Sequence, residues 1–194
     1  MLRAYALGYF PMDRSGASGP VSFYEADPRA VLPIEGFQVP RSVRRALRRE
    51  RYEVRVDDDF PAVVAACAVG RPDAWLTPRL AAAYVRLHRA GQAHSVEAWR
   101  DGRLCGGLFG VALGGLFTSE SMFHRRTDAG NVALVAAAAM LAKAGFTLWD
   151  IQMSSQHTRR FGAVEVRSRD YRERLDHALA VEPGPLDPTA APLG

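Results

Sequence analysis

Hydrophobic and polar residues alternate in three successive runs near the middle of the chain, which predicts three β-strands. The runs are 94–99, 104–113 and 117–123. Asp101-Gly102 joins the first two and is a strong hairpin signal, and the glycines within 113–116 make a second tight turn. The pattern therefore predicts an antiparallel meander.

Helical patterns lie on both sides of this meander. Residues 129–143 are apolar nearly all round, which predicts a helix buried against the sheet, and 147–151 predicts a strand that follows it. Thr77-Pro78 has the form of an N-cap followed by proline at the first helical position. Further helices are predicted at 60–69, 78–90 and 169–179. This order of elements predicts a mixed α/β domain.

Composition excludes several classes of protein. Hydrophobic residues make up 48% of the 194 and charged residues 24%, which is typical of a globular chain. The most apolar run, 132–144, is too short to span a bilayer, and no secretory signal precedes the first helix. Cys67 and Cys105 are isolated and fit no metal-binding spacing. We therefore expect a cytoplasmic protein, with no membrane association, with reduced cysteines and without a metal site.

The positive charge is concentrated in one short segment. The net charge is only +4, but the chain contains a single lysine, Lys143, and its other basic residues, histidine aside, are arginines. Helical spacing places four of them on one face, namely Arg41, Arg44, Arg45 and Arg48. This stripe is either a solvated helix face or a surface that contacts nucleic-acid phosphates.

Two groups of polar residues lie in predicted strands. Alternation places Glu120 on one face with Thr118 and Met122, where a carboxylate is costly unless it is paired. Asp150 and Gln152 share a face near the end of the following strand, where they could orient an amine and accept its proton. Pairing with an arginine, for Glu120, and a turn or cap, for Asp150, are the structural alternatives.

Other catalytic signatures are weak. The sequence contains no nucleophile elbow, Walker loop or metal-ligand spacing of histidines. Several apolar residues around the strands are candidates either for a pocket or for plain core, and their types alone do not separate the two. They are Trp75, Leu108, Phe117, Met122, Leu134 and Trp149.

Taken in order, short motifs over residues 4–171 resemble the bacterial leucyl/phenylalanyl-tRNA–protein transferases. The most specific are Asp27-Pro28-Arg29-Ala30-Val31-Leu32, Trp75-Leu76-Thr77, His94-Ser95-Val96-Glu97, Glu120-Ser121-Met122-Phe123, Asp150 with Gln152, and Arg169-Asp170-Tyr171. The resemblance implies an acetyltransferase-like (GNAT) mixed sheet with packed helices. It also implies a shortened amino-terminal domain at 1–32, a catalytic domain at 33–180 and a tail at 181–194 that its prolines predict to be disordered.

The resemblance also implies a reaction. Such enzymes transfer Leu, Phe or Met from aminoacyl-tRNA to proteins that begin with Arg or Lys, and the product is an N-degron. No cofactor is needed, because the aminoacyl ester is already activated, and we expect a monomer. Glu120 would hold the cationic acceptor residue, and Asp150 and Gln152 would orient and activate its α-amino group. The six apolar residues above would form the aminoacyl pocket, and the arginine stripe would bind tRNA.

Departures from the family pattern affect parts of this expectation. The chain begins a few dozen residues later than is usual, Met12 stands where tryptophan is common, and Trp149 is bulkier than the usual aliphatic residue.

The alternative functions are those of a coenzyme A-dependent N-acetyltransferase, which would share the fold, and of a tRNA- or degron-binding relative without catalysis. Residues 124–132 lack the glycine pattern by which such acetyltransferases cradle pyrophosphate.

Overall fold

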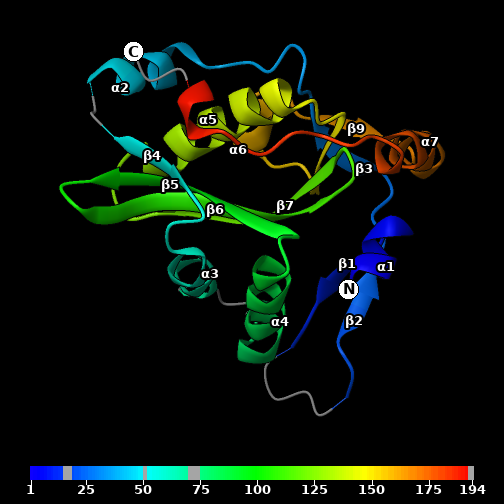
Figure 1. The fold of residues 1–194 in the computed structure, drawn as a ribbon. Coiled ribbons are helices and arrows are strands. Elements are labelled where there is room, and N and C mark those ends of the chain that lie inside the picture. The colour runs from blue at the N-terminus through cyan, green and yellow to red at the C-terminus, as the bar shows by residue number, and fades with distance from the viewer. Residues whose placement is uncertain (15–18, 50–51, 70–74, 192–194) are drawn as a thin grey trace.

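A seven-stranded mixed sheet forms the centre of the computed structural model, which describes residues 1–14, 19–49, 52–69 and 75–191 (Figure 1). Its strands, in spatial order, are β4 (Glu53–Val56), β5 (Ala93–Arg100), β6 (Arg103–Leu113), β7 (Leu116–His124), β8 (Leu148–Gln152), β3 (Arg29–Leu32) and β9 (Val164–Val166). β7 and β8 are parallel, and the other neighbouring pairs are antiparallel. The predicted meander and the mixed α/β class are confirmed.

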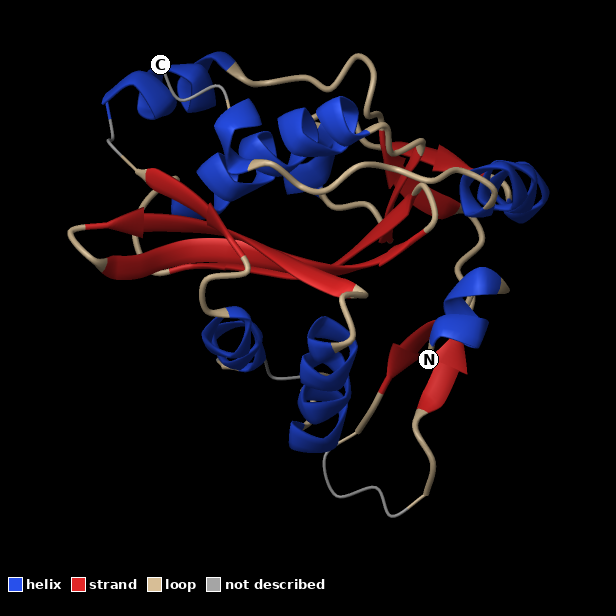
Figure 2. Cartoon of the chain, in the orientation of Figure 1, coloured by secondary structure: helices blue, strands red, loops and turns tan. Residues whose placement is uncertain are grey.

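Helices cover both faces of this sheet (Figure 2). α3 (Phe60–Ala68) and α4 (Pro78–Arg89) lie on one face, and α2 (Arg41–Arg49), α5 (Ala129–Ala144) and α6 (Gln156–Arg159) lie on the other. α1 (Leu2–Ala6) packs with the α3–α4 core, and α7 (Ser168–Leu179) packs against β3, β7 and β8. The two largest hydrophobic clusters therefore occupy opposite faces, one centred on α5 and one on α3 and α4.

Local signals in the sequence set the ends of these helices. The Thr77 side chain accepts a hydrogen bond from the Leu80 N–H at the start of α4, as its N-cap position predicts. Asp59 caps α3 in the same way by accepting from Ala62 at 3.0 Å. α5 ends at Gly145, whose φ of 84° is readily adopted by glycine.

A β-bulge in β7 corrects the face assignment made from simple alternation. In β6, Gly110 pairs with Ser119 and the preceding residue, Phe109, pairs with Ser121. Glu120 has no partner in β6 and is therefore the extra residue of the bulge. Beyond the bulge the side chains change face. Met122 therefore packs against the α5 core, whereas Glu120 stays on the α4 side with Thr118. The expectation that Met122 shares a face with these two residues is wrong.

The bulge depends on a glycine in the opposite strand. A Cβ atom on Gly110 would lie 2.2 Å from the carbonyl oxygen of Thr118, which is far inside contact distance. Any side chain at position 110 would thus collide with the backbone immediately before the bulge. The sequence positions Glu120 through this close approach of β6 to β7.

A two-stranded hairpin at the amino terminus was not predicted. β1 (Phe10–Met12) pairs with β2 (Ser22–Tyr24) as a separate sheet. The buried carboxylate of Asp13 attaches this hairpin to α4, because it accepts hydrogen bonds from Thr77 and Arg79. β3 lies within the segment that the sequence assigns to an amino-terminal domain, yet it is a strand of the large sheet.

The segment after α7, predicted to be disordered, runs along α5. The Gly184 N–H donates to the Ala144 carbonyl oxygen at 2.7 Å, and Lys143 pairs with Asp187 at 2.6 Å. A short 3₁₀ helix (Pro188–Ala190) follows and contacts α5 and β4. Residues 192–194 lie outside the described part of the chain.

The structure also bears on the expectations about membrane spans, metal sites and cysteines. Over the described ranges, no helix combines the length and apolar character needed to cross a bilayer. Within the same ranges, no cluster of three or more His, Cys, Asp or Glu side chains could hold a metal ion. Cys67 and Cys105 are both buried.

Candidate active site

Two adjoining cavities open where β7 and β8 meet the amino-terminal hairpin. The sheet cavity, of about 240 Å³, is lined by Leu32, Leu108, Ser119, Ser121, Met122, Leu134, His157 and Thr158. The hairpin cavity, of about 260 Å³, is lined by Phe10, Pro11, Met12 and Trp75. Both cavities also share one set of lining residues, namely Glu120, Ile151, Gln152 and Met153. Glu120 and Gln152 are thus the polar side chains at the boundary between the two cavities.

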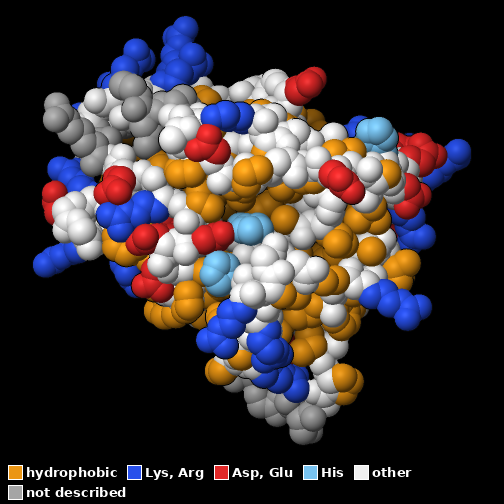
Figure 3. Space-filling view, in the orientation of Figure 1, with side chains coloured by type: hydrophobic (Ala, Val, Ile, Leu, Met, Phe, Trp, Pro, Cys, Tyr) orange, Lys and Arg blue, Asp and Glu red, His pale blue; other side chains and the backbone are white. Residues whose placement is uncertain are grey.

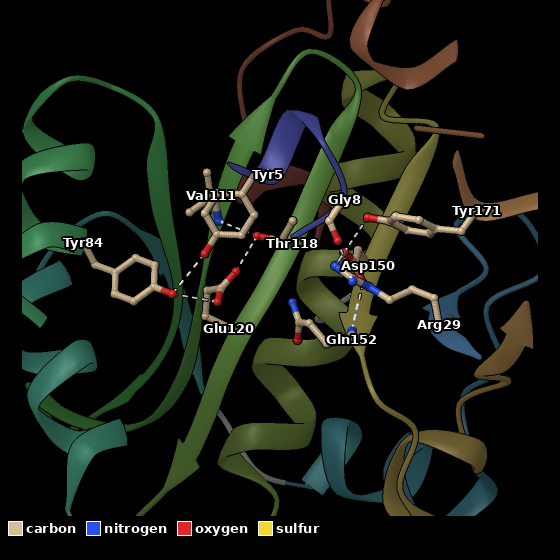
Figure 4. A network of polar contacts seen from close by, with 10 residues as sticks. All are labelled: Tyr5, Gly8, Arg29, Tyr84, Val111, Thr118, Glu120, Asp150, Gln152 and Tyr171. Carbon is tan, nitrogen blue, oxygen red and sulfur yellow. Dashed lines mark hydrogen bonds and ion pairs between the residues drawn. The ribbon is translucent and has the colours of Figure 1, made fainter. Parts of the chain in front are cut away.

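Glu120 is held by hydroxyl groups from three elements (Figure 4). Its Oε2 accepts from the Tyr84 hydroxyl at 2.7 Å, and its Oε1 accepts from the Thr118 hydroxyl at 2.6 Å. The Tyr84 hydroxyl is in turn 3.0 Å from that of Tyr5 in α1. Over the ranges that the structure describes, no arginine pairs with Glu120, so the structural alternative of an arginine partner does not explain this carboxylate.

Burial gives Glu120 an unusual proton affinity. It raises the pKa of this carboxyl to about 7, even though the hydrogen bonds from Thr118 and Tyr84 act in the opposite direction. The negative charge of Asp150 on the neighbouring strand raises the pKa further. A cation placed beside Glu120 would favour the ionised form, so this position is suited to a positively charged ligand group.

Asp150 accepts four hydrogen bonds and is completely buried. Arg29 donates through Nε to Oδ1 at 2.9 Å and through Nη2 to Oδ2 at 2.6 Å. The Tyr171 hydroxyl donates to Oδ2 at 2.7 Å, and the Gln152 backbone N–H donates to Oδ1 at 2.8 Å. These bonds use the acceptor sites of a carboxylate, which leaves Asp150 poorly placed to take a proton from a substrate.

Arg29 is the centre of this second network. Its side chain is 1% exposed, and its third donor, Nη1, reaches the Gly8 carbonyl oxygen at 2.8 Å. The guanidinium also lies over the rings of Phe10 and Tyr171, at 4.8 and 4.7 Å from their centroids. Despite the opposing effect of burial, the hydrogen bonds from Arg29 to Asp150 raise the pKa of the arginine. The guanidinium group therefore stays charged, and its hydrogen bonds link the amino-terminal segment to β8.

Gln152 has a backbone conformation that few residues other than glycine adopt. Its φ is 58°, and the hydrogen bond from its N–H to Asp150 stabilises this geometry. When its amide is oriented to satisfy its neighbours, Nε2 donates to the carbonyl oxygens of Ile151 at 3.0 Å and Ser119 at 3.1 Å. Figure 4 shows this side chain between the two carboxylates, directed toward Glu120.

The six residues proposed for an aminoacyl pocket separate into three groups. Leu108, Met122 and Leu134 line the sheet cavity, whereas Trp75 lines the hairpin cavity. Phe117 and Trp149 are both 0% exposed and lie in the core. Trp149 donates from Nε1 to the Ser119 hydroxyl at 2.8 Å and stacks on Phe37, so it supports the cavity wall from behind.

Two polar side chains of the sheet cavity stand out. Among the described residues, the buried Ser121 hydroxyl has no hydrogen-bond partner, although such groups are almost always paired. His157 donates from Nε2 to Asn131 Oδ1 at 2.8 Å, and burial lowers the pKa of His157. The sheet cavity is therefore bordered by a residue with an unpartnered hydroxyl and by an imidazole whose neutral form is favoured.

The arginine stripe is exposed, as the sequence predicts. α2 buries Val43 and Ala46 and leaves Arg41, Arg44, Arg45 and Arg48 exposed. Figure 3 shows basic side chains gathered over this helix at the upper left of the molecule. The stripe is separate from the two cavities, so any role in binding is at a distance from the polar networks.

The sequence alone did not assign roles to the partners of the two carboxylates. Arg29 is 121 positions from Asp150, and Tyr5 is 79 positions from Tyr84. The signal that was available is the arginine within the otherwise apolar strand 29–32, because a buried charge requires a partner.

Comparisons with known proteins are consistent across most of the chain. Residues 31–176 match the family model described as leucyl/phenylalanyl-tRNA protein transferase. A protein of that name from Paramagnetospirillum magneticum is 46% identical over 93% of this chain and 88% of its own. Another from Rubrobacter xylanophilus is 46% identical over 94% of both chains. These names do not favour the acetyltransferase or the binding-only alternative.

Proposed function

Because the chain belongs to the leucyl/phenylalanyl-tRNA–protein transferase family, we propose that the two cavities bind the aminoacyl end of a tRNA beside Glu120 and Gln152. The reaction is transfer of Leu, Phe or Met to a protein that begins with Arg or Lys. The acceptor's amine nitrogen attacks the ester carbonyl carbon, a peptide bond forms, and the bond to the ribose oxygen breaks. That oxygen receives a proton and leaves as the tRNA hydroxyl group.

The apolar sheet cavity is suited to the donor side chain. Leu108, Met122 and Leu134 offer an apolar surface that excludes charged side chains but distinguishes aliphatic ones by only about 1–3 kcal/mol per methylene. The unpartnered Ser121 hydroxyl is placed to hydrogen-bond a polar group of the aminoacyl ester. This arrangement supports several apolar donors rather than one.

The hairpin cavity is suited to the terminal adenosine. Trp75 supplies an aromatic surface on which a base can stack, an interaction of about 1–3 kcal/mol. Met12 provides an apolar surface in the same cavity. With the base here and the side chain in the sheet cavity, the ester would lie at the shared wall of Glu120 and Gln152.

The single observation that carries this proposal is the position of Glu120 at that wall. Its ionised carboxylate would attract the cationic first side chain of the acceptor, bidentately for Arg and as a point charge for Lys. Gln152 would accept a hydrogen bond from the α-amino group through Oε1. Asp150 is a positioning residue in this scheme, since its four bonds fix the Gln152 backbone.

The same proposal extends to the fold class, to the place and product of the reaction, and to the α2 stripe. The parallel pair β7 and β8, connected by α5 within an otherwise antiparallel sheet, supports the acetyltransferase-like fold class. Since aminoacyl-tRNA is found in the cytoplasm, the reaction would occur there, and its product would be an N-degron. The α2 stripe would contact tRNA phosphates.

The test is a transfer assay with the full chain. Labelled Phe-tRNA is incubated with a peptide that begins with Arg and, as a control, with the same peptide beginning with Ala. Glu120→Gln is compared with Glu173→Gln, a matched change at an exposed position of α7. We expect label on the Arg peptide, a large loss only in Glu120→Gln, and none on the Ala peptide. Equal labelling of both peptides, or full activity of Glu120→Gln, would contradict the role of Glu120.

A further inference from the structure

A hollow lined by arginines lies at the carboxyl end of α2, away from the two cavities. It has a volume of about 450 Å³ and is lined by Arg49, Tyr52, Arg100, Arg125, Arg126 and Thr127. Three separate parts of the chain meet here, namely the end of α2, the β5–β6 hairpin and the turn between β7 and α5. We name it the basic hollow.

The turn that carries two of these arginines is fixed to the sheet. The backbone N–H groups of Arg125 and Arg126 both donate to the Cys105 carbonyl oxygen, at 2.7 and 3.2 Å. The nearly buried Tyr52 donates from its hydroxyl to the Thr127 carbonyl oxygen at 3.0 Å. The two side chains are thus presented from a fixed backbone.

Within the described part of the chain, Arg125 and Arg126 have no carboxylate partner. Arg55 and Arg79, by contrast, are both paired. Arg125 instead lies over the Phe123 ring, 5.4 Å from its centroid. The guanidinium groups of Arg125 and Arg126 can therefore attract an anion, and phosphate matches their geometry well.

Other arginines lie at the opposite end of α2 and next to α6. At the opposite end of α2, Arg41, Arg44 and Arg160 line a further hollow of about 440 Å³. Arg160 directly follows α6, whose His157 lines the sheet cavity. Arginines therefore occur next to α6, along α2 and in the basic hollow.

We propose that the basic hollow binds phosphates of the aminoacyl-tRNA that lie beyond its terminal adenosine, with Arg125 and Arg126 as contacts in addition to the α2 stripe. This inference rests on the proposed function, since it supposes that the aminoacyl ester lies in the cavities. The RNA would then leave the site along α2 and end its contact with the protein at the β5–β6 hairpin.

The experiment compares a large and a small donor. Phe-tRNA and the phenylalanyl ester of adenosine are each used with wild type, Arg126→Ala and Arg126→Glu. Arg174→Ala, an exposed arginine on α7, is the matched control. We expect KM for Phe-tRNA to rise about threefold in Arg126→Ala and more than tenfold in Arg126→Glu. The slope of log KM against log salt should fall by about 1 in Arg126→Ala.

The small donor separates this inference from the function on which it rests. Because it carries no phosphates, its KM should be the same in all four proteins. A KM for Phe-tRNA within twofold of wild type in Arg126→Glu would overturn the inference, as would an equal loss with both donors. So would weaker binding of free inorganic phosphate in Arg126→Ala and Arg126→Glu with an unchanged KM for Phe-tRNA, which would indicate an adventitious anion site. Absence of transfer from both donors by the wild type would instead overturn the proposed function.

Discussion

Arg29 and Asp150 form a bidentate ion pair in which both side chains are at most 1% exposed. The pair joins β3 to β8 across their antiparallel contact and reaches the Gly8 carbonyl oxygen through the remaining arm of the guanidinium. A carboxylate that is saturated in this way acts through the residues it holds. Under the proposed function, its hydrogen bond with the Gln152 backbone makes it a support for the active site.

The first prediction concerns the stability of this pair. Asp150→Ala leaves the Arg29 charge buried without a partner, so we expect the free energy of unfolding to fall by about 3–5 kcal/mol in urea titrations. Glu25→Ala, which breaks an exposed pair with Arg172, should leave the urea midpoint nearly unchanged. A small change in Asp150→Ala would show that the pair is not the support we describe.

The second prediction separates support from proton transfer. Tyr171→Phe removes one hydrogen bond to Asp150, which should lower stability by about 1 kcal/mol and reduce kcat modestly. If Asp150 only positions Gln152, the pH profile of kcat should keep its midpoint. A displaced midpoint in Tyr171→Phe would instead show that Asp150 takes part in proton transfer.

The third prediction uses the raised pKa of Glu120. Below pH 7 both Glu120, with its pKa of about 7, and the acceptor's α-amino group, at roughly 8, become protonated. Since each must lose its proton, log kcat/KM for the acceptor should fall with a slope of about 2 per pH unit in the wild type. In Glu120→Gln the slope should be about 1, because only the amine titrates.

An exposed carboxylate provides the control for this profile. Glu173→Gln on α7 should keep the wild-type slope. The same slope in Glu120→Gln as in the wild type would mean that ionisation of Glu120 does not govern acceptor binding.

The fourth prediction is that Glu120 reduces stability above neutral pH. Its pKa is raised from 4.5 to about 7 on folding, so the folded state binds more protons between these values. Stability of the wild type should therefore fall as pH rises through this range, and Glu120→Gln should not show that fall. At pH 8 the free energy of unfolding should be about 1–3 kcal/mol larger for Glu120→Gln than for the wild type. At pH 4 the two values should differ little. A variant less stable at pH 8 would contradict this reasoning.

The sequence predicts those features of the site that depend on residues close together in the chain, and it does not predict those that depend on residues far apart. The strands, their turns and the helix caps follow from local patterns, and so does the proximity of Asp150 to Gln152. The partners of the carboxylates come from α1, β3, α4 and α7, and no local spacing indicates them. Trp75 and Leu108 line different cavities. The amino-terminal hairpin, which the sequence did not predict, forms one wall of the cavity that Trp75 lines.

The orientation of Met122 shows the limit of alternation most clearly. Period-two alternation assumes that each residue has one partner across the ladder, and the bulge opposite Gly110 breaks that assumption. A glycine within a strand is a recognised sign of a bulge or a close backbone approach, so Gly110 was the available signal.

The fifth prediction follows from that glycine. In Gly110→Ala the new methyl group would meet the Thr118 carbonyl oxygen, so β7 must move or the bulge must be lost. Either change redirects Glu120, and we expect kcat/KM for the acceptor to fall at least tenfold with a loss of stability of about 1–3 kcal/mol. Gly184→Ala is the control, because the nearest atom to its Cβ is 3.8 Å away and its φ is not positive. Wild-type transfer by Gly110→Ala would mean that the active site tolerates another path for β7, and that the bulge does not determine where Glu120 lies.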